Sequence, residues 1–311
     1  MSNSPKQLIL HHYPTSPFAE KIRLILGFKG LHWSSVIIPS IMPKPDVIAL
    51  TGGYRKTPIL QIGADIYCDT SLIADVIDSQ APQPSLNPIA VAGASRILAQ
   101  WADSTLFWTM IPFTLQPAGL AHVFSGVSPE AQKAFAEDRN VFRANLPRMR
   151  LPEATAAFTL YLERLEQMLG KQRFFFGAAA SIADFSIYHN LWFVKRGGPV
   201  AKILDSHPAL EAWRERMGAI GHGTHEDLGS AAAIAIAHGA AAAGAGPGVD
   251  THGIAIGEKV VVAATDTGTD PIEGALHAAT KDQIAISRED PRAGKVVVHF
   301  PRIGFELRRV K

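Results

Sequence analysis

The sequence is poor in cysteine and has no surplus of charge of either sign. Cys68 is the one cysteine among 311 residues, which excludes an intramolecular disulfide and a zinc site built on clustered cysteines. It also fits a reducing compartment. Thirty Lys and Arg residues oppose 28 Asp and Glu residues, and no part of the chain is a basic platform. We therefore expect neither nucleic acid nor an anionic membrane as a partner.

Long hydrophobic runs and targeting signals are also missing. Residues 1–7 are polar and lead directly into a short apolar run, without the layout of a signal peptide. The Ala-rich stretch 230–246 is too weakly hydrophobic for a spanning helix. Glycines around His222 and His225 favour a loop over a metal-binding helix. We expect a cytoplasmic protein with no membrane-spanning helix and no metal.

The apolar patterns divide the chain into successive regions. In residues 1–80, strand and helix signals alternate as β-α-β followed by β-β-α. After a stiff proline-rich linker, residues 88–225 carry helical signals. Residues 226–250 are rich in Ala and Gly, which predicts a helix and a tether. Residues 251–311 show five short strands separated by turns, a pattern typical of a small β-barrel or sandwich.

The first chemical motif is the segment YPTSP at residues 13–17, between the first strand and the first helix. Ser16 is suited to cap that helix, and Pro17 suits its first position. The free N–H groups and the positive dipole end favour an anion there. A thiolate held by the Ser16 hydroxyl would have a lowered pKa. The alternative is that Ser16 only caps the helix.

Two further motifs lie on either side of the hairpin predicted for residues 59–67. A cis bond between Thr57 and Pro58 would turn the backbone of Thr57 outward, toward a peptide-like ligand, whereas a trans proline at a strand edge is the commoner alternative. Asp69 and Thr70 open the next helix and have two interpretations. They cap it, or Asp69 holds an ammonium group while the helix N–H groups hold a carboxylate.

These motifs, in this order and followed by a helical region, resemble the glutathione S-transferase family over about residues 7–220. The resembling segments are YPTSPF at 13–18, KTPIL at 56–60 and DTSLIA at 69–74.

The resemblance implies an α/β thioredoxin-like domain at residues 1–80 and an all-helical domain at residues 88–225. To these the chain adds a small all-β domain at residues 251–311, whose pattern is similar to an SH3-like barrel.

The resemblance also implies a role for each matching residue. Ser16 stabilises the glutathione thiolate, with Tyr13 as the second candidate. The Thr57 backbone meets the cysteinyl part beside a cis proline, and an acid and a hydroxyl grip the γ-glutamyl end. Which basic residue meets the glycyl carboxylate stays open. The implied glutathione-binding residues are Lys56, Thr57, Pro58, Asp69 and Thr70.

The implied reaction is attack of the glutathione thiolate on a hydrophobic electrophile, with glutathione as co-substrate, in a homodimer. Phe107 and Trp108 lie on an early helix of the second region. They belong to the core or, as in the resembled family, to the electrophile pocket. Because the cysteine stands at 68 and not at 16, the reacting thiol must come from the ligand.

Other interpretations remain open at this point. The protein could bind glutathione or another ligand without catalysis and use its C-terminal β domain for interaction, since fold does not imply function. A glutathione-dependent isomerase or dehalogenase would share the thiolate. The pair Ser181 and Asp184 forms a capping box, which makes Asp184 structural. The segment DTG at residues 266–268 is interpreted as a hairpin turn.

Overall fold

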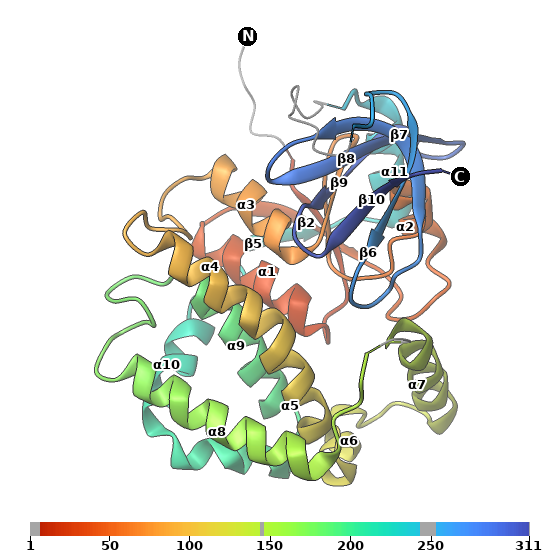
Figure 1. Cartoon of the computed structure of the whole chain (residues 1–311). Helices are drawn as coiled ribbons and strands as arrows, with labels where there is room; N and C mark the ends of the chain where they lie inside the picture. The colour runs from red at the N-terminus through yellow and green to blue at the C-terminus, as the bar shows by residue number, and fades with distance from the viewer. Residues whose placement is uncertain (1–6, 144–145, 243–252, 311) are drawn as a thin grey trace.

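The N-terminal part of the protein is an α/β unit. The computed structural model describes residues 7–143, 146–242 and 253–310. β1 pairs with β2 in parallel and with β3 antiparallel, so the predicted β-α-β and β-β-α halves are confirmed (Figure 1). Between them lies a short helix, Pro45–Thr51, that was not predicted. The elements are β1 (Ile9–His12), α1 (Pro17–Phe28), β2 (His32–Ile37), α2 (Pro45–Thr51), β3 (Ile59–Ile62), β4 (Asp65–Cys68) and α3 (Thr70–Gln80).

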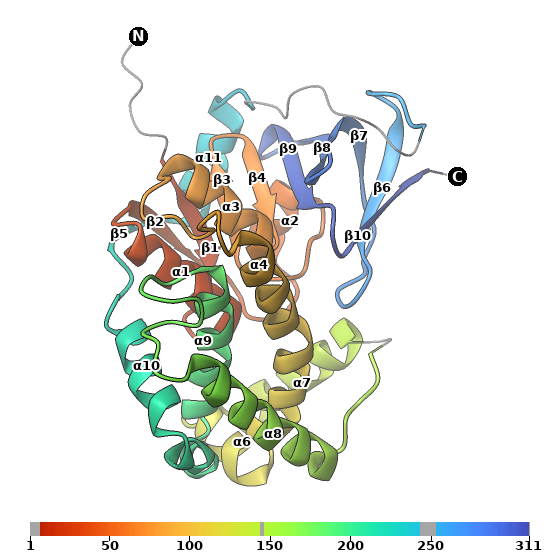
Figure 2. The same ribbon diagram turned by 60° about the vertical axis from the view of Figure 1, so that its left-hand side comes forward.

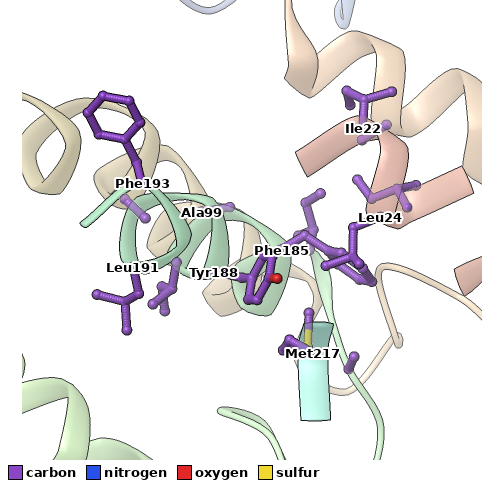
Figure 3. Close-up of a cluster of buried hydrophobic side chains, with 14 of the residues drawn as sticks. Ile22, Leu24, Ala99, Phe185, Tyr188, Leu191, Phe193 and Met217 are labelled. Atoms are coloured by element: carbon purple, nitrogen blue, oxygen red, sulfur yellow. The ribbon is translucent and has the colours of Figure 1, made fainter. Parts of the chain in front are cut away.

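The second part is helical, as predicted. Its central helix, α9, is buried along most of its length because it packs against both α1 and α4. Figure 3 shows part of the resulting core, in which Ile22 of α1, Phe185 of α9 and Met217 of α10 belong to one buried cluster. One hydrophobic core therefore joins the two parts. The elements are α4 (Ala92–Trp101), a π-helical segment (Ala102–Leu106), α5 (Phe107–Thr114), α6 (Pro117–Val123), α7 (Pro129–Arg143), α8 (Leu151–Leu169), α9 (Ile182–Lys195), a 3-10 helix (Gly198–Ser206) and α10 (Pro208–Gly218).

The strand-rich C-terminal region is confirmed, and it continues the N-terminal sheet. All strands belong to one ten-stranded sheet of order β10-β6-β7-β8-β9-β4-β3-β1-β2-β5. Figure 2 shows β9 beside β4, with which it pairs in parallel. The remaining elements are β5 (Thr224–Asp227), α11 (Ser230–Gly239), β6 (Lys259–Ala264), β7 (Ile272–Ala279), β8 (Gln283–Asp290), β9 (Gly294–Pro301) and β10 (Phe305–Arg309).

The junction between β4 and β9 carries a buried polar contact. The His299 Nε2 atom lies 2.9 Å from Asp65 Oδ1, and both side chains are almost inaccessible. The His299 ring also stacks on Tyr67, with 4.5 Å between the ring centres. Behind the junction, α11 packs against β9 and α2. The C-terminal region is thus attached to the N-terminal sheet through backbone, side chains and a helix.

Several finer predictions have different outcomes. The strand order has β10 and β5 at its edges and, among the described residues, no pairing that closes a barrel, so the SH3-like barrel is not confirmed. Strand β5 was not predicted. It crosses the expected boundary between residues 225 and 226 and pairs with β2. The domain boundaries stay predictions. The helix expected after residue 226 is α11, whereas residues 243–250 of the expected tether lie outside the described residues.

The described helices include none that is both long and apolar enough to cross a membrane.

The predicted capping box is present at the start of α9, and its Asp184 also binds groups outside this helix. The buried Asp184 carboxylate accepts hydrogen bonds from the backbone N–H of Ser181 (2.8 Å) and of Phe175 (3.1 Å), and from Trp213 Nε1 (3.0 Å). It therefore joins the start of α9 to the preceding loop and to α10.

Replacing Asp184 with alanine should lower the free energy of unfolding by about 3 kcal/mol or more, because each buried donor left without an acceptor costs about 1–3 kcal/mol. Urea unfolding measures the change. Glu163→Ala on the exposed face of α8 is the control, with an expected change within about 0.5 kcal/mol. A loss as small as that of the control would contradict the structural role of Asp184.

Stability should also fall in acid, because β1 carries two buried histidines. Burial lowers the pKa of His11 to about 4 and the pKa of His12 to about 3. An unfolded histidine titrates near pH 6.5, so below this pH the unfolded state binds protons that the folded state does not. The urea concentration at the midpoint of unfolding should be constant above about pH 6.5 and should decrease progressively toward pH 4. His11→Asn should make this pH dependence shallower, whatever its effect at pH 7. An unchanged slope would show that His11 is not the group responsible.

Candidate functional site

A cavity of about 870 Å³ lies where the N-terminal sheet, the helical part and the C-terminal strands meet. The lining of this cavity includes residues from four places in the fold. These places are the start of α1, the entry to β3, the start of α3 and the aromatic side chains of α5. Every site residue named from the sequence lines this cavity, and their chemical roles stay predictions. They are Tyr13, Ser16, Lys56, Thr57, Pro58, Asp69, Thr70, Phe107 and Trp108.

Ser16 and Tyr13 form a pair of hydroxyl groups at the N-terminus of α1. Ser16 caps the helix, because its Oγ atom accepts a hydrogen bond from the Ala19 N–H at 3.2 Å. Burial raises the pKa of Tyr13, although Arg139 and a hydrogen bond to Ser16 act in the opposite direction. The Tyr13 hydroxyl thus keeps its proton at neutral pH. The two candidates for thiol activation lie beside one another.

Two lysines lie near the entry to β3, and one of them, Lys56, lines the cavity. The Thr57–Pro58 peptide bond is cis. The Thr57 hydroxyl accepts a hydrogen bond from Lys44 Nζ at 3.0 Å, and burial, followed by nearby Arg139, lowers the pKa of Lys44 to about 8. The neighbouring Lys56 forms an ion pair with Asp266, at 2.5 Å between Nζ and Oδ1. A residue of the C-terminal region therefore already neutralises Lys56.

The start of α3 has an unusual backbone. Asp69 caps the helix with φ at +73°, a region that non-glycine residues seldom adopt and in which strained residues tend to cluster at active sites and ligand clamps. Its Oδ1 atom accepts hydrogen bonds from the Ser71 backbone N–H (2.9 Å) and hydroxyl (2.7 Å). The next hydroxyl, on Thr70, accepts a hydrogen bond from Lys21 Nζ at 3.3 Å.

Lys21 belongs to a buried polar cluster that sequence reasoning missed. Its ammonium group lies 2.6 Å from Asp103 Oδ2, which joins α1 to the helical part. Asp103 also accepts hydrogen bonds from His189 (2.9 Å) and Ser186 (3.2 Å). Burial acts to raise the pKa of Asp103, but Lys21 and His189 together hold it below its ordinary value. The one available signal was an acidic residue within the apolar sequence that follows α4.

The aromatic wall of the cavity comes from the helical part. Phe107 is 8% exposed, packs on Phe18 at 4.7 Å between ring centres, and contacts Trp108 at 5.0 Å. Both residues of α5 also line the cavity. Phe107 and Trp108 therefore contact the core and also form part of the cavity wall, so the two interpretations are compatible.

The C-terminal strands supply the outer wall. Asp266 and Thr267, in the turn between β6 and β7, line the cavity. The Gly268 N–H in the same turn donates to the Phe142 carbonyl of α7 at 2.9 Å. Gly268 has φ at +57°, and a Cβ atom there would come within 2.8 Å of the Phe142 ring. The segment DTG is the expected hairpin turn, and it also docks on α7.

Comparisons with known proteins agree with this geometry. Residues 10–85 match the model of the glutathione S-transferase N-terminal domain, and residues 148–216 match that of the C-terminal domain. A GST-like protein from Pseudomonas syringae is 42% identical over 98% of this chain and 100% of its own, with a TM-score of 0.82. The chain belongs to the glutathione S-transferase family.

Two more distant structures share the transferase fold. One is a glutathione S-transferase from Rhodospirillum rubrum, with 19% identity over 68% of this chain and 88% of its own and a TM-score of 0.51. The other is a beta-etherase from Sphingobium, with 20% identity over 68% of this chain and 95% of its own and a TM-score of 0.51. No curated protein matches the chain.

Groups of three or more His, Cys, Asp or Glu side chains arranged to hold a metal ion do not occur in the part of the chain that the structure describes.

Replacing Asp103 with alanine should leave the Lys21 ammonium buried without its carboxylate. We expect the free energy of unfolding to fall by about 3 kcal/mol, the lower end of the range for broken buried ion pairs. The double variant Lys21→Met/Asp103→Leu should recover most of this loss, because apolar side chains of similar size tolerate burial.

Urea unfolding of both variants tests this prediction. Asp75→Ala is the matched control, since Asp75 forms a half-exposed ion pair with Arg96, and such pairs contribute only about 0–1 kcal/mol. An equal loss in the single and the double variant would show that the ion pair is not what stabilises this junction.

Proposed function

We propose that this protein is a glutathione transferase that joins the thiolate of glutathione to a hydrophobic electrophile. The observation that carries the proposal is one cavity with a pair of hydroxyl groups at a helix N-terminus, a second helix N-terminus at Asp69, and an aromatic wall. These are the parts needed for a thiolate, an amino-acid end and an apolar substrate. Membership of the transferase family supports the same assignment.

In the proposed complex, the γ-glutamyl end of glutathione lies at the start of α3. Its ammonium group meets the Asp69 carboxylate, and its carboxylate meets the helix N–H groups and the Thr70 hydroxyl. The cysteinyl backbone pairs with that of Thr57. Lys56 lies in the same segment, but any contact it makes with the glycyl carboxylate competes with its ion pair to Asp266.

The thiol then lies at the N-terminus of α1, beside Ser16 and Tyr13. A donated hydroxyl hydrogen and the positive end of the helix favour the thiolate, and each unit of pKa lowering corresponds to about 1.4 kcal/mol. The sulfur attacks the electrophilic carbon. In a substitution, the leaving group departs with the bonding electron pair, and the thiol proton goes to solvent.

The chain's own thiol is unsuited to this chemistry. Cys68 is fully buried, and burial, followed by the Asp69 charge, raises its pKa well above the ordinary value. A neutral, inaccessible thiol is a poor nucleophile. This supports a reacting thiol supplied by the ligand.

Family membership also supports a homodimer, which a monomeric mass in light scattering would contradict. The cytoplasmic location expected from the sequence stays a prediction.

Ser16→Ala should lower the kcat for conjugation of 1-chloro-2,4-dinitrobenzene by about 100-fold, the usual effect of losing one donor to a developing anion. Glutathione affinity should stay nearly unchanged, because the Asp69 and Thr57 contacts remain. Initial rates and calorimetric titration with glutathione measure the two quantities.

Tyr13→Phe is the companion variant. Full activity in Ser16→Ala together with a loss in Tyr13→Phe would transfer the role to Tyr13. Glutathione-induced thermal stabilisation of the wild type without turnover would favour a binding or scaffold protein. No stabilisation would contradict the glutathione site.

A further inference from the structure

Helix α7 (Pro129–Arg143) brings two arginines to the cavity. None of its residues is fully buried, and in Figure 1 it stands apart from the other helices, below the C-terminal strands. Arg139 and Arg143 both line the cavity. Residues four apart lie on the same face of a helix, so this face of α7 is turned toward the cavity.

Most other cations of the lining have acidic partners. Lys21, Lys56 and Arg96 form ion pairs with Asp103, Asp266 and Asp75. Arg139 lies 3.2 Å from Asp138, a carboxylate that also lies 2.8 Å from Arg55, and Arg55 has a second partner in Asp270 at 3.7 Å. These two arginines therefore also have acidic partners.

Arg143 has no carboxylate oxygen within ion-pairing distance among the described residues. Burial, followed by the nearby charge of Arg148, lowers the pKa of Arg143. Its Nε atom is buried and, among the described residues, has no hydrogen-bond partner. An anionic ligand in the cavity would give the guanidinium group the carboxylate partner that the described residues do not supply.

The surroundings of Arg143 orient it for a planar anion. Its guanidinium carbon lies 4.7 Å from the centre of the Trp108 ring, so the two groups are in cation–π contact. Contact with the ring limits the orientations of the guanidinium group, whose N–H groups match the two oxygens of a carboxylate. The neighbouring lining is apolar, with Phe107, Ile111 and Leu115 from the same helical segment.

We propose that Arg143 is the anion receptor of the electrophile subsite, and that the electrophile is an aromatic compound with a carboxylate at the end away from the carbon attacked. This substrate class rests on the proposed conjugation. Trp108 directly follows Phe107, which packs on Phe18 near the start of α1. An aromatic ring between the thiolate and Trp108 would therefore direct a remote carboxylate toward Arg143.

The test compares two substrates that differ in one charge, 4-chloro-3-nitrobenzoate and 4-chloro-3-nitrobenzamide. In both, the thiolate sulfur bonds to the carbon bearing chlorine, and chloride leaves with the bonding electrons. Each kcat/KM is divided by the uncatalysed rate constant to correct for intrinsic reactivity. We expect the wild type to favour the benzoate by about tenfold, the usual size of one charge-assisted hydrogen bond.

Arg143→Met should lower kcat/KM for the benzoate by about tenfold. For the benzamide, the fold-loss in kcat/KM should be at least three times smaller than for the benzoate. Arg143→Lys, which keeps the charge, should retain part of the preference. Arg164→Met on α8 is the control, since Arg164 is exposed and outside the cavity lining, and both substrates should react as with the wild type. An equal loss of kcat/KM for the two substrates would overturn the proposal. So would a raised KM for glutathione without a selective loss of kcat/KM for the benzoate.

Binding separates this proposal from the conjugation itself. The chlorine-free compounds 3-nitrobenzoate and 3-nitrobenzamide cannot be conjugated by substitution, and calorimetry measures their affinities. Tighter binding of the benzoate that is lost in Arg143→Met would support the receptor even if neither chloro compound turns over, in which case only conjugation has failed. Equal affinities in the wild type would overturn the receptor, whether or not conjugation is observed.

Discussion

The parallel pairing of β9 with β4 determines where the whole C-terminal region lies. Without β9, β4 would be an edge strand with unpaired N–H and C=O groups on one side. The Val297 N–H donates to the Ala64 carbonyl at 3.0 Å, and the contact between His299 and Asp65 buries a polar pair beside it. Because β8, β7, β6 and β10 follow β9 in the sheet, this one junction positions the turns that reach the cavity.

The cavity is consequently built from three parts of the chain that differ in chemistry. The N-terminal part presents two helix N-termini, at Ser16 and at Asp69, and each favours negative charge. The helical part presents aromatic side chains, and the C-terminal turns close the outer side. The ion pair between Lys21 and Asp103 connects the first two parts beneath the cavity. A tripeptide thiol with an anionic end and an apolar partner match this division.

The local motifs could be predicted from the sequence because neighbouring residues determine them. A serine before a proline caps a helix wherever the helix lies, and the hairpin entry at Thr57 follows from chain geometry. The short strand-like runs of the C-terminal region and the turns between them were enough to place β6 to β10. Their attachment was not predictable, since pairing of Tyr67 with His299 joins distant residues and leaves no local pattern. Strand β5 was missed because its short sequence is exposed and polar.

The charge of the cavity also could not be predicted from the sequence. The sequence is nearly neutral, with 30 cationic and 28 anionic residues, and no sum over its regions reveals a place for an anion. What matters inside a cavity is which charges are paired, because a nearby carboxylate cancels most of the field of a cation at short range. The pairs of Lys21 and Lys56 depend on contacts between distant segments, as does the position of Arg143 over Trp108. The selectivity proposed for an anionic substrate therefore depends on the fold and not on the composition.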